Sequence, residues 1–194
     1  MNSDMADENE AGTSTLLYAS AHQLFADSEA AARDMVSRPV NGEDSLAFMA
    51  NLLESDTPEE AINFGAYLLP KRKAVWWGHE CLRGLNHLLV EQDLAMLQLA
   101  ENWVREPDEA RRVQALTQAS AVRNETPGVW IAYAAGWSGG SMATPDLPPV
   151  PPPPYLTPRA VSAGILGALA KVDLGHRATT LGVFVRMGID LARR

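Results

Sequence analysis

The amino-acid sequence predicts an all-α protein of about nine short helices, packed as antiparallel hairpins or stacked irregularly like HEAT repeats. Three observations predict this fold class. Apolar residues recur at spacings of three and four, and the strict alternation of a half-buried strand is missing almost everywhere. Thr-Pro pairs at positions 57, 126 and 157 combine a helix N-cap with proline at the first helical position. With 46% hydrophobic and 21% charged residues, the 194 residues suit one globular domain.

The expected helices follow one another along the whole chain. The clearest start is the TPEE sequence at residues 57–60, where Thr57 takes the N-cap and Glu60 returns a hydrogen bond to the Thr57 amide. Residues 129–135 also resemble a strand, but the Thr-Pro pair before them favours a helix. Glycines at positions 164, 167, 175, 182 and 188 are expected to let the last two helices approach closely. Helical periodicity covers residues 16–25, 27–36, 41–53, 57–69, 71–89, 91–105, 107–120, 126–137, 160–171 and 177–192.

Residues 1–13 are predicted to be a disordered acidic leader, and residues 14–194 a single helical domain. The first twelve residues hold four acidic and no basic residues, whereas a secretory signal needs a positive start and an apolar stretch. No apolar run reaches the ~18–20 residues that span a bilayer. The lone Cys81 excludes an intramolecular disulfide framework. These features predict a cytoplasmic protein without a membrane partner.

The net charge of −8 is unevenly spread. Residues 27–60 hold nine acidic and two basic residues, which form either a solvated helix face or a surface for a basic partner. Residues 159–194 hold six basic and two acidic residues, so DNA binding through the last helix is a further functional class, with salt-dependent affinity. Because the whole chain is acidic, no nucleic-acid partner is expected.

Residues 144–158 form a proline-rich crossing segment that holds eight of the thirteen prolines. Proline fixes φ and lacks an amide hydrogen, so the run of prolines must be extended. The segment is either a strut that lies across the chain's own helices, against Trp130 and Trp137, or a PxxP ligand with Pro148 and Pro151. Helices expected on both sides favour a strut that leads to a C-terminal hairpin.

The sharpest catalytic pattern is G-x-S-x-G at residues 136–140, which presents Ser138 as a nucleophile. Such an elbow needs a strand before the serine and a helix after it, but here the chain continues into the proline-rich segment. Asp173 and His176 follow in the order of a triad but lie close together in the sequence. A helix that ends here, with Gly139 as its left-handed cap, explains the same residues. A serine hydrolase using Ser138 is therefore the alternative function, and no catalytic residue is predicted.

Metal and cofactor sites are not expected. His79 and His87 share a helical segment with Cys81, which suggests zinc ligands. The zincin pattern needs a second histidine four residues after the first, where the chain has Arg83. The chain also has no P-loop, dinucleotide fingerprint or EF-hand loop. Surface histidines and a buried free thiol explain this segment better.

One face of the expected helix at residues 71–89 is predicted to bind a protein partner. The inward stripe of this helix holds a second tryptophan, Trp77, and the opposite face holds Trp76 among cationic residues. Tryptophan beside arginine is typical of binding hot spots. Alternatively, Trp76 packs beneath a neighbouring helix or the proline-rich segment. The predicted binding residues are Arg72, Trp76, His79, Arg83 and Trp137.

Three stretches carry a resemblance to a known family. Residues 68–77 (LLPKRKAVWW), residues 100–104 (AENWV) and WSGGS at residues 137–141, leading into the polyproline run, resemble a bacterial protein family of unknown function. The resemblance covers roughly residues 57–157 and leaves out the acidic N-terminal third. That family is associated with type VI secretion gene neighbourhoods. The resemblance implies a helical accessory, adaptor or chaperone-like protein that binds a secretion component or effector, and it supplies no catalytic residues. The predicted function is thus a non-enzymatic protein-interaction module.

Overall fold

The computed structural model describes residues 16–143 and 147–194, so the predicted leader at residues 1–13 lies outside the described chain. Within these two ranges the chain forms ten α-helices and no strand, with one isolated β-bridge between Ser20 and Asp44. The all-α prediction is confirmed. The helices are α1 (Ala21–Asp27), α2 (Glu29–Asp34), α3 (Ser45–Asn51), α4 (Glu60–Leu68), α5 (Lys71–Arg83), α6 (Glu91–Arg105), α7 (Glu109–Ser120), α8 (Pro127–Gly136), α9 (Leu156–Leu169) and α10 (Leu174–Ala192).

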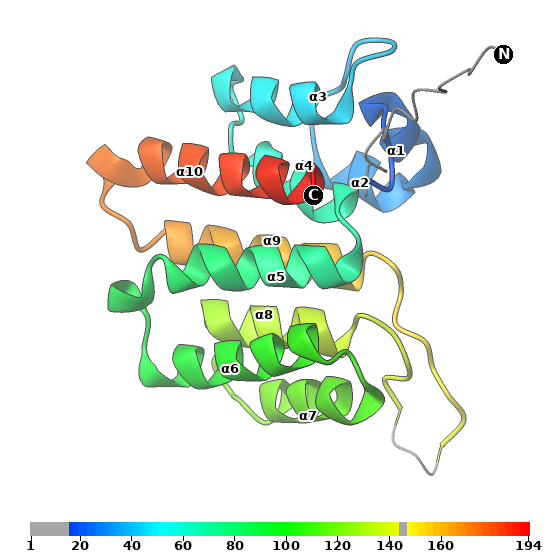
Figure 1. Cartoon of the computed structure of the whole chain (residues 1–194), viewed down its shortest axis with the longest axis vertical. Coiled ribbons are helices and arrows are strands. Elements are labelled where there is room, and N and C mark those ends of the chain that lie inside the picture. Colours follow the sequence, from blue (N-terminus) through cyan, green and yellow to red (C-terminus); the bar gives the residue numbers. More distant parts are fainter. Residues whose placement is uncertain (1–15, 144–146) are drawn as a thin grey trace, which may run out of the picture.

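The helices lie one above another along the long axis of the molecule, from α3 through α10, α5 and α8 to α7 (Figure 1). Helix α8 packs against α6, α7 and α9, while α5 packs against α6, α8 and α9. Helix α4 contacts α2, α9 and α10 and so joins the N-terminal helices to the rest. The last two helices run antiparallel as a hairpin (Figure 1). None of the helices in the described ranges has the length and apolarity needed to cross a lipid bilayer.

The start of α4 differs from the predicted capping box. The Glu60 carboxylate accepts hydrogen bonds from the backbone N–H groups of Val36 and Ser37, the second at 2.9 Å. The Thr57 N–H instead donates to the Ser55 hydroxyl at 3.1 Å. Burial alone would raise the pKa of Glu60, but the hydrogen bonds from residues 36, 37 and 57 outweigh it and hold that pKa below its ordinary value. The predicted return bond is therefore wrong, because Glu60 ties α4 to the chain that follows α2.

Several helix boundaries also differ from the expected ones. The N-cap of α4 is Glu59 rather than Thr57, and Thr157 lies inside α9, which begins at Leu156, so the Thr-Pro prediction is wrong at these two helix starts. Helix α5 ends at Arg83, and a separate 3₁₀ turn, η2 (Asn86–Leu88), comes next. Helix α3 begins after Asp44 rather than Asn41. The Asp44 carboxylate accepts two N–H groups from the first turn of α3, both at 2.9 Å, as an N-cap should.

Trp77 joins α5 to α4 and α10 and is fully buried. Its indole nitrogen donates a hydrogen bond of 2.9 Å to the Phe184 carbonyl oxygen. Gly65 of α4 and Gly188 of α10 make room for the ring, since a Cβ on either would come within 2.9 Å of an indole atom. The glycine prediction is thus wrong. Gly164 and Gly167 face residues of α8, Gly188 faces Trp77 of α5, and no atom of α9 lies near Gly175 or Gly182, so none of the five glycines lets the last two helices approach closely.

The chain between Met142 and Val150, the proline-rich loop, has its two ends joined at a neck. Residues 144–146 of the predicted crossing segment lie outside the described residues. The Met142 N–H donates to the Val150 carbonyl oxygen at 2.8 Å, and the Val150 N–H donates to the Ser141 hydroxyl at 3.0 Å. Arg112 of α7 is buried and donates to the carbonyl oxygens of Gly136 and Ser141. This arginine therefore fastens the neck to α7 and to the end of α8.

Two details of this loop bear on the sequence predictions. Pro148 and Pro151 of the PxxP match are exposed, whereas Pro152 is buried. The strut and the ligand interpretations both stay predictions. The left-handed residue of the turn is Gly140, with a φ of 62°, and not Gly139. A Cβ on Gly140 would come within 2.6 Å of the buried guanidinium group at the neck, which requires glycine there.

Candidate functional site

Four of the five predicted binding residues lie on α5, and two of them, Arg72 and His79, contact α6. His79 is only 4% exposed, and its ring stacks on that of Trp76 with centroids 4.9 Å apart and 13° between the planes. Its Nδ1 atom lies 3.0 Å from Glu80 Oε1, and its Nε2 atom lies 3.8 Å from Glu101 Oε2 of α6. His79 is therefore enclosed between two helices.

Arg72 and Arg83 are exposed at the two ends of α5. The Arg72 guanidinium donates to the carbonyl oxygens of Val104 at 2.7 Å and Arg105 at 3.3 Å. These carbonyl groups belong to the last turn of α6, where helical partners run out. Arg83 pairs with Glu80 at 2.6 Å on the surface. Arg72 thus helps to hold α5 against α6, and Arg83 lines the exposed edge of α5.

Trp76 is half-buried and packs against the hydrophobic core. It also lines a groove of about 460 Å³ together with Met187, Leu191 and Arg194 from the C-terminal end of the chain. The alternative that Trp76 packs beneath a neighbouring helix therefore holds for part of the ring, and the rest borders an open surface.

Trp137 and Ser138 follow α8 directly. The Trp137 ring stacks on Tyr133, with centroids 4.6 Å apart and 17° between the planes. The Ser138 carbonyl oxygen accepts a hydrogen bond from the Lys71 ammonium group at 3.1 Å. A helix precedes this serine and an irregular segment follows it, so the strand–turn–helix arrangement of a nucleophile elbow is not present in this described stretch.

Among the described residues, those of the metal-binding types do not gather into a site. Within residues 16–143 and 147–194, no group of three or more histidine, cysteine, aspartate or glutamate side chains could hold a metal ion. Cys81 is buried, and both its burial and the nearby Glu80 charge raise the pKa of its thiol well above the ordinary value. The thiol is therefore protonated and poorly reactive at neutral pH.

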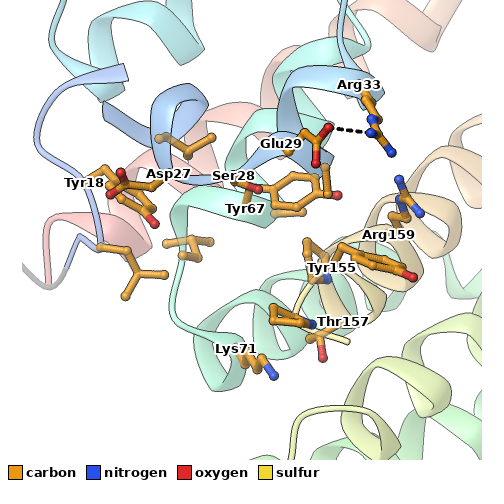
Figure 2. A pocket seen from close by; sticks show the side chains of 17 residues that line it. Tyr18, Asp27, Ser28, Glu29, Arg33, Tyr67, Lys71, Tyr155, Thr157 and Arg159 are labelled. Carbon is orange, nitrogen blue, oxygen red and sulfur yellow. Dashed lines mark hydrogen bonds and ion pairs between the residues drawn. The ribbon is translucent and has the colours of Figure 1, made fainter. Parts of the chain in front are cut away.

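A groove of about 520 Å³ lies between α1 and α2 on one side and the first turns of α5 and α9 on the other (Figure 2). We call it the tyrosine groove, because Tyr18, Tyr67 and Tyr155 line it, three of the four tyrosines in the chain. Figure 2 shows Tyr67 at its centre, with Tyr18 and Tyr155 on opposite sides. The apolar part of its wall includes Leu17, Leu24, Leu69 and Pro154.

An ion pair fixes one wall of the tyrosine groove. Arg159 of α9 pairs with both carboxylate oxygens of Asp34 at 2.8 Å, and the Tyr67 hydroxyl donates to the same carboxylate. The Arg159 guanidinium also lies over the Tyr155 ring, 4.4 Å from its centroid. Burial would raise the pKa of Asp34, but hydrogen bonds from Arg159 and Tyr67 hold it below its ordinary value. Burial and the Asp34 hydrogen bond raise the pKa of Tyr67, which stays a neutral donor.

The lower end of the groove in Figure 2 is formed by Lys71 and Thr157. Lys71 is partly buried, and this burial lowers the pKa of its ammonium group. Thr157 is fully buried, and its hydroxyl has no hydrogen-bond partner among the described residues. A buried hydroxyl without a partner costs about 1–3 kcal/mol of stability, so its presence calls for a reason.

Sequence reasoning missed this groove. Its lining residues belong to several separate features of the sequence analysis, such as the acidic stretch at residues 27–60, residues 68–77 and the proline-rich segment at 144–158, but nothing in the sequence joined these features into one site. The tyrosines stand at positions 18, 67 and 155, far apart in the sequence. No local pattern connects them, because their convergence requires the packing of α2, α4 and α9.

Comparison with known families gives one match. Residues 48–192 match the sequence model of DUF6931, a family of unknown function. The match extends beyond the stretch of the resemblance and includes α9 and α10, whereas α1 and α2 lie outside it. No curated protein and no solved structure matches the chain.

Proposed function

The chain belongs to the DUF6931 family of unknown function, and from its own geometry we propose that it is a non-enzymatic module that binds a segment of another protein in the tyrosine groove. The observation that carries this proposal is the meeting of Tyr18, Tyr67, Tyr155 and Arg159 around one preformed groove. Tyrosine and arginine are enriched among the residues that dominate binding energy at protein interfaces.

The rigidity of the groove supports the same proposal. The network of Asp34, Tyr67 and Arg159 fixes the spacing of its walls, so a bound segment does not have to order them. A volume of about 520 Å³ lies within the range of ~300–1,000 Å³ that accommodates small ligands or a few side chains of a peptide. The groove therefore suits a short segment and not a broad flat interface.

The exposed edge of α5 is a second surface in this proposal. Trp76 borders the groove with α10, and Arg83 lies exposed on the same helix. Trp137 is partly buried beside Ser138, whose carbonyl contacts Lys71 at the end of the tyrosine groove. A large partner could contact both surfaces, since both are on or beside α5.

We further propose that the partner is a component or effector of a type VI secretion system and that binding occurs in the cytoplasm. The support is the resemblance of residues 68–77, 100–104 and 137–141, together with the single cysteine. The gene neighbourhood tests this part: secretion genes beside the gene for this chain are expected, and their absence in several genomes that encode such a chain would remove the link.

Site-specific photo-cross-linking tests the binding site. A photoreactive phenylalanine at position 155, in cells that encode the chain, should give a discrete adduct, identified by mass spectrometry. The same probe in place of Gln118, exposed on α7 at the far end of the molecule (Figure 1), should not give it. With the purified partner, Tyr155→Ala should weaken binding about tenfold or more and Gln118→Ala should not. Equal adducts at both positions, or equal affinities, would overturn the proposal.

A further inference from the structure

We propose that the tyrosine groove selects partner segments that carry an acidic side chain, whose carboxylate binds between Lys71 and Thr157. This inference rests on the proposed function and adds the chemical class of the bound segment. It is carried by three properties of the lower end of the groove: a cation with no counter-charge and a buried hydroxyl with no hydrogen-bond partner among the described residues, and the first turns of two helices.

Lys71 differs from the other cations of the groove in what it contacts. Arg33 pairs with Glu29, and Arg159 pairs with Asp34, so both already face a carboxylate. The Lys71 ammonium group has three donor hydrogens, and its acceptor among the described residues is the uncharged Ser138 carbonyl. The positive charge at this end therefore lacks a counter-charge within the described chain.

The surroundings of Lys71 make a carboxylate the best-suited partner. Burial lowers the pKa of this lysine, which indicates that the charged form has lost water without gaining an anion. A hydrogen bond between an ammonium and a carboxylate is stronger than one between neutral groups, and more so away from water. An acidic side chain at this point would restore the solvation that Lys71 loses.

Thr157 supplies a second donor at the same end. Its side chain is fully buried, its hydroxyl has no partner in the described ranges, and the residue lines the groove beside Lys71 in Figure 2. An ionised carboxylate accepts hydrogen bonds on both oxygens. Because the hydroxyl is itself closed off from the groove, it donates to a carboxylate held by Lys71 once the Thr157 side chain turns toward the groove.

Two helix N-termini add to the positive potential of this end. Helix α5 begins at Lys71 and helix α9 begins at Leu156, and they have 13 and 14 residues. The N-terminus of a helix carries a partial positive charge and favours an anion in its first turn. The acidic residues of the groove, Asp27 and Glu29, belong to α1 and α2 on the other side (Figure 2). The potential is therefore positive at the end of the groove near Lys71, and the acidic side chains lie on the side of α1 and α2.

The geometry favours an internal acidic residue over a chain end. The lining of the groove continues on both sides of Lys71, toward Tyr18 on one side and toward Tyr155 and Arg159 on the other (Figure 2). A bound segment can therefore continue on both sides of the residue that contacts Lys71. An aspartate or glutamate side chain then reaches Lys71 while its neighbours contact the tyrosines.

Selection from a library of displayed dodecapeptides, fused at their C-termini, tests the inference on the full chain. The wild type should enrich peptides with an aspartate or glutamate next to apolar or aromatic residues. Lys71→Glu should enrich lysine or arginine at that position, and Lys71→Met should lose the charge preference. Lys171→Glu makes the same charge change at an exposed residue that follows α9, and its peptides should match those of the wild type. Thermal unfolding by circular dichroism checks that each variant is folded.

A synthetic enriched peptide then measures the contact directly. Replacing its acidic residue by the amide should weaken binding to the wild type about tenfold, and should have little effect on binding to Lys71→Met. If no peptide is enriched by any folded variant, the proposed function fails. If peptides are enriched without an acidic residue, or Lys71→Glu selects the same ones, this inference fails and the binding function stands. If amidation of the free C-terminus of the peptide abolishes binding, the assignment of the bound carboxylate to an internal acidic residue is also wrong.

Discussion

Arg159 of α9 pairs with both carboxylate oxygens of Asp34 at the end of α2, each at 2.8 Å, although the two residues are 125 positions apart. The Tyr67 hydroxyl reaches the same carboxylate from α4. Because α1 and α2 lie outside the matched family region, this ion pair joins the unmatched N-terminal helices to the part of the chain that the family model matches. The groove lies where these two parts meet.

Removal of this contact should destabilise the N-terminal helices. Arg159→Leu leaves the Asp34 carboxylate without its cation, and we expect the free energy of unfolding to fall by about 1–2 kcal/mol. Arg33→Leu removes an exposed pair with Glu29 and should cost at most about 0.5 kcal/mol. Urea unfolding followed by circular dichroism measures both. Equal losses in the two variants would contradict the role given to Arg159.

Stability should fall in acid, and Glu60 should account for part of the fall. Its folded pKa is lower than its ordinary value of 4.5, so the unfolded chain binds the proton first as the pH drops. The stabilisation by Glu60 is therefore complete above the ordinary pKa and is lost as the pH falls through the folded pKa. The pKa of Asp34 is also lowered in the folded chain, so its stabilisation is likewise lost as the pH falls.

Urea unfolding between pH 7 and pH 3 measures this dependence. The wild type should lose stability below about pH 5, and Glu60→Gln should lose less over the same interval, because glutamine does not titrate. Glu59→Gln is the matched control, since Glu59 is exposed next to it. The assignment is wrong if the Glu60→Gln and wild-type curves remain parallel.

Gly188 should tolerate no side chain. In Gly188→Ala the new Cβ would come within 2.9 Å of the buried Trp77 ring, and overpacking of this kind costs about 1–3 kcal/mol. Gly175→Ala is also in α10 but has open space around it, and should gain up to about 1 kcal/mol from helix propensity. Thermal melting of the two variants separates packing from propensity, and equal melting temperatures would refute the packing argument.

The α5 edge can be tested independently of the tyrosine groove. Trp76→Ala should weaken binding of the cross-linked partner and lower stability, because the ring is half-buried against His79. Arg83→Ala removes an exposed side chain, so any loss of affinity in this variant reports on the surface alone. Isothermal titration with the purified partner measures both. Unchanged affinity in both variants removes the α5 edge from the binding site.

Ser138 should not act as a nucleophile. We expect no labelling of the protein by a fluorophosphonate probe, because the serine follows a helix and lacks the elbow that would expose it. Detection on a gel beside a known serine hydrolase sets the sensitivity. Labelling that disappears in Ser138→Ala would support the hydrolase alternative and overturn the binding-module proposal.

The sequence predicts well what depends on neighbouring residues. The Thr-Pro pair at positions 126–127 places the start of α8 correctly, because an N-cap and a first-turn proline act within a few residues. The apolar spacing likewise predicts the burial of Trp77. Glu60 shows the limit of such rules. The local sequence predicts that its carboxylate accepts a hydrogen bond from the start of its own helix, but the carboxylate instead accepts hydrogen bonds from the N–H groups of residues 36 and 37.

The site depends on contacts that no local pattern encodes. Trp76 and His79 share a helix face, as predicted, but only the position of α6 decides that His79 is enclosed and Trp76 partly open. The tyrosine groove combines residues from both ends of the chain, and its polarity follows from which cations already have partners. Lys71 is one of several basic residues in the sequence, and it is distinguished only by what surrounds it.

The joined neck of the proline-rich loop makes the loop a tolerant place for added sequence. The Met142 and Val150 backbones are hydrogen-bonded to each other, and Arg112 holds the neck against the helices. The ends of the loop therefore stay in place even when the chain between them is lengthened. Lengthening such a loop costs only a logarithmic amount of chain entropy. An epitope tag or fluorescent label placed there would leave the helical stack and the tyrosine groove intact, which offers a handle for following this protein in cells.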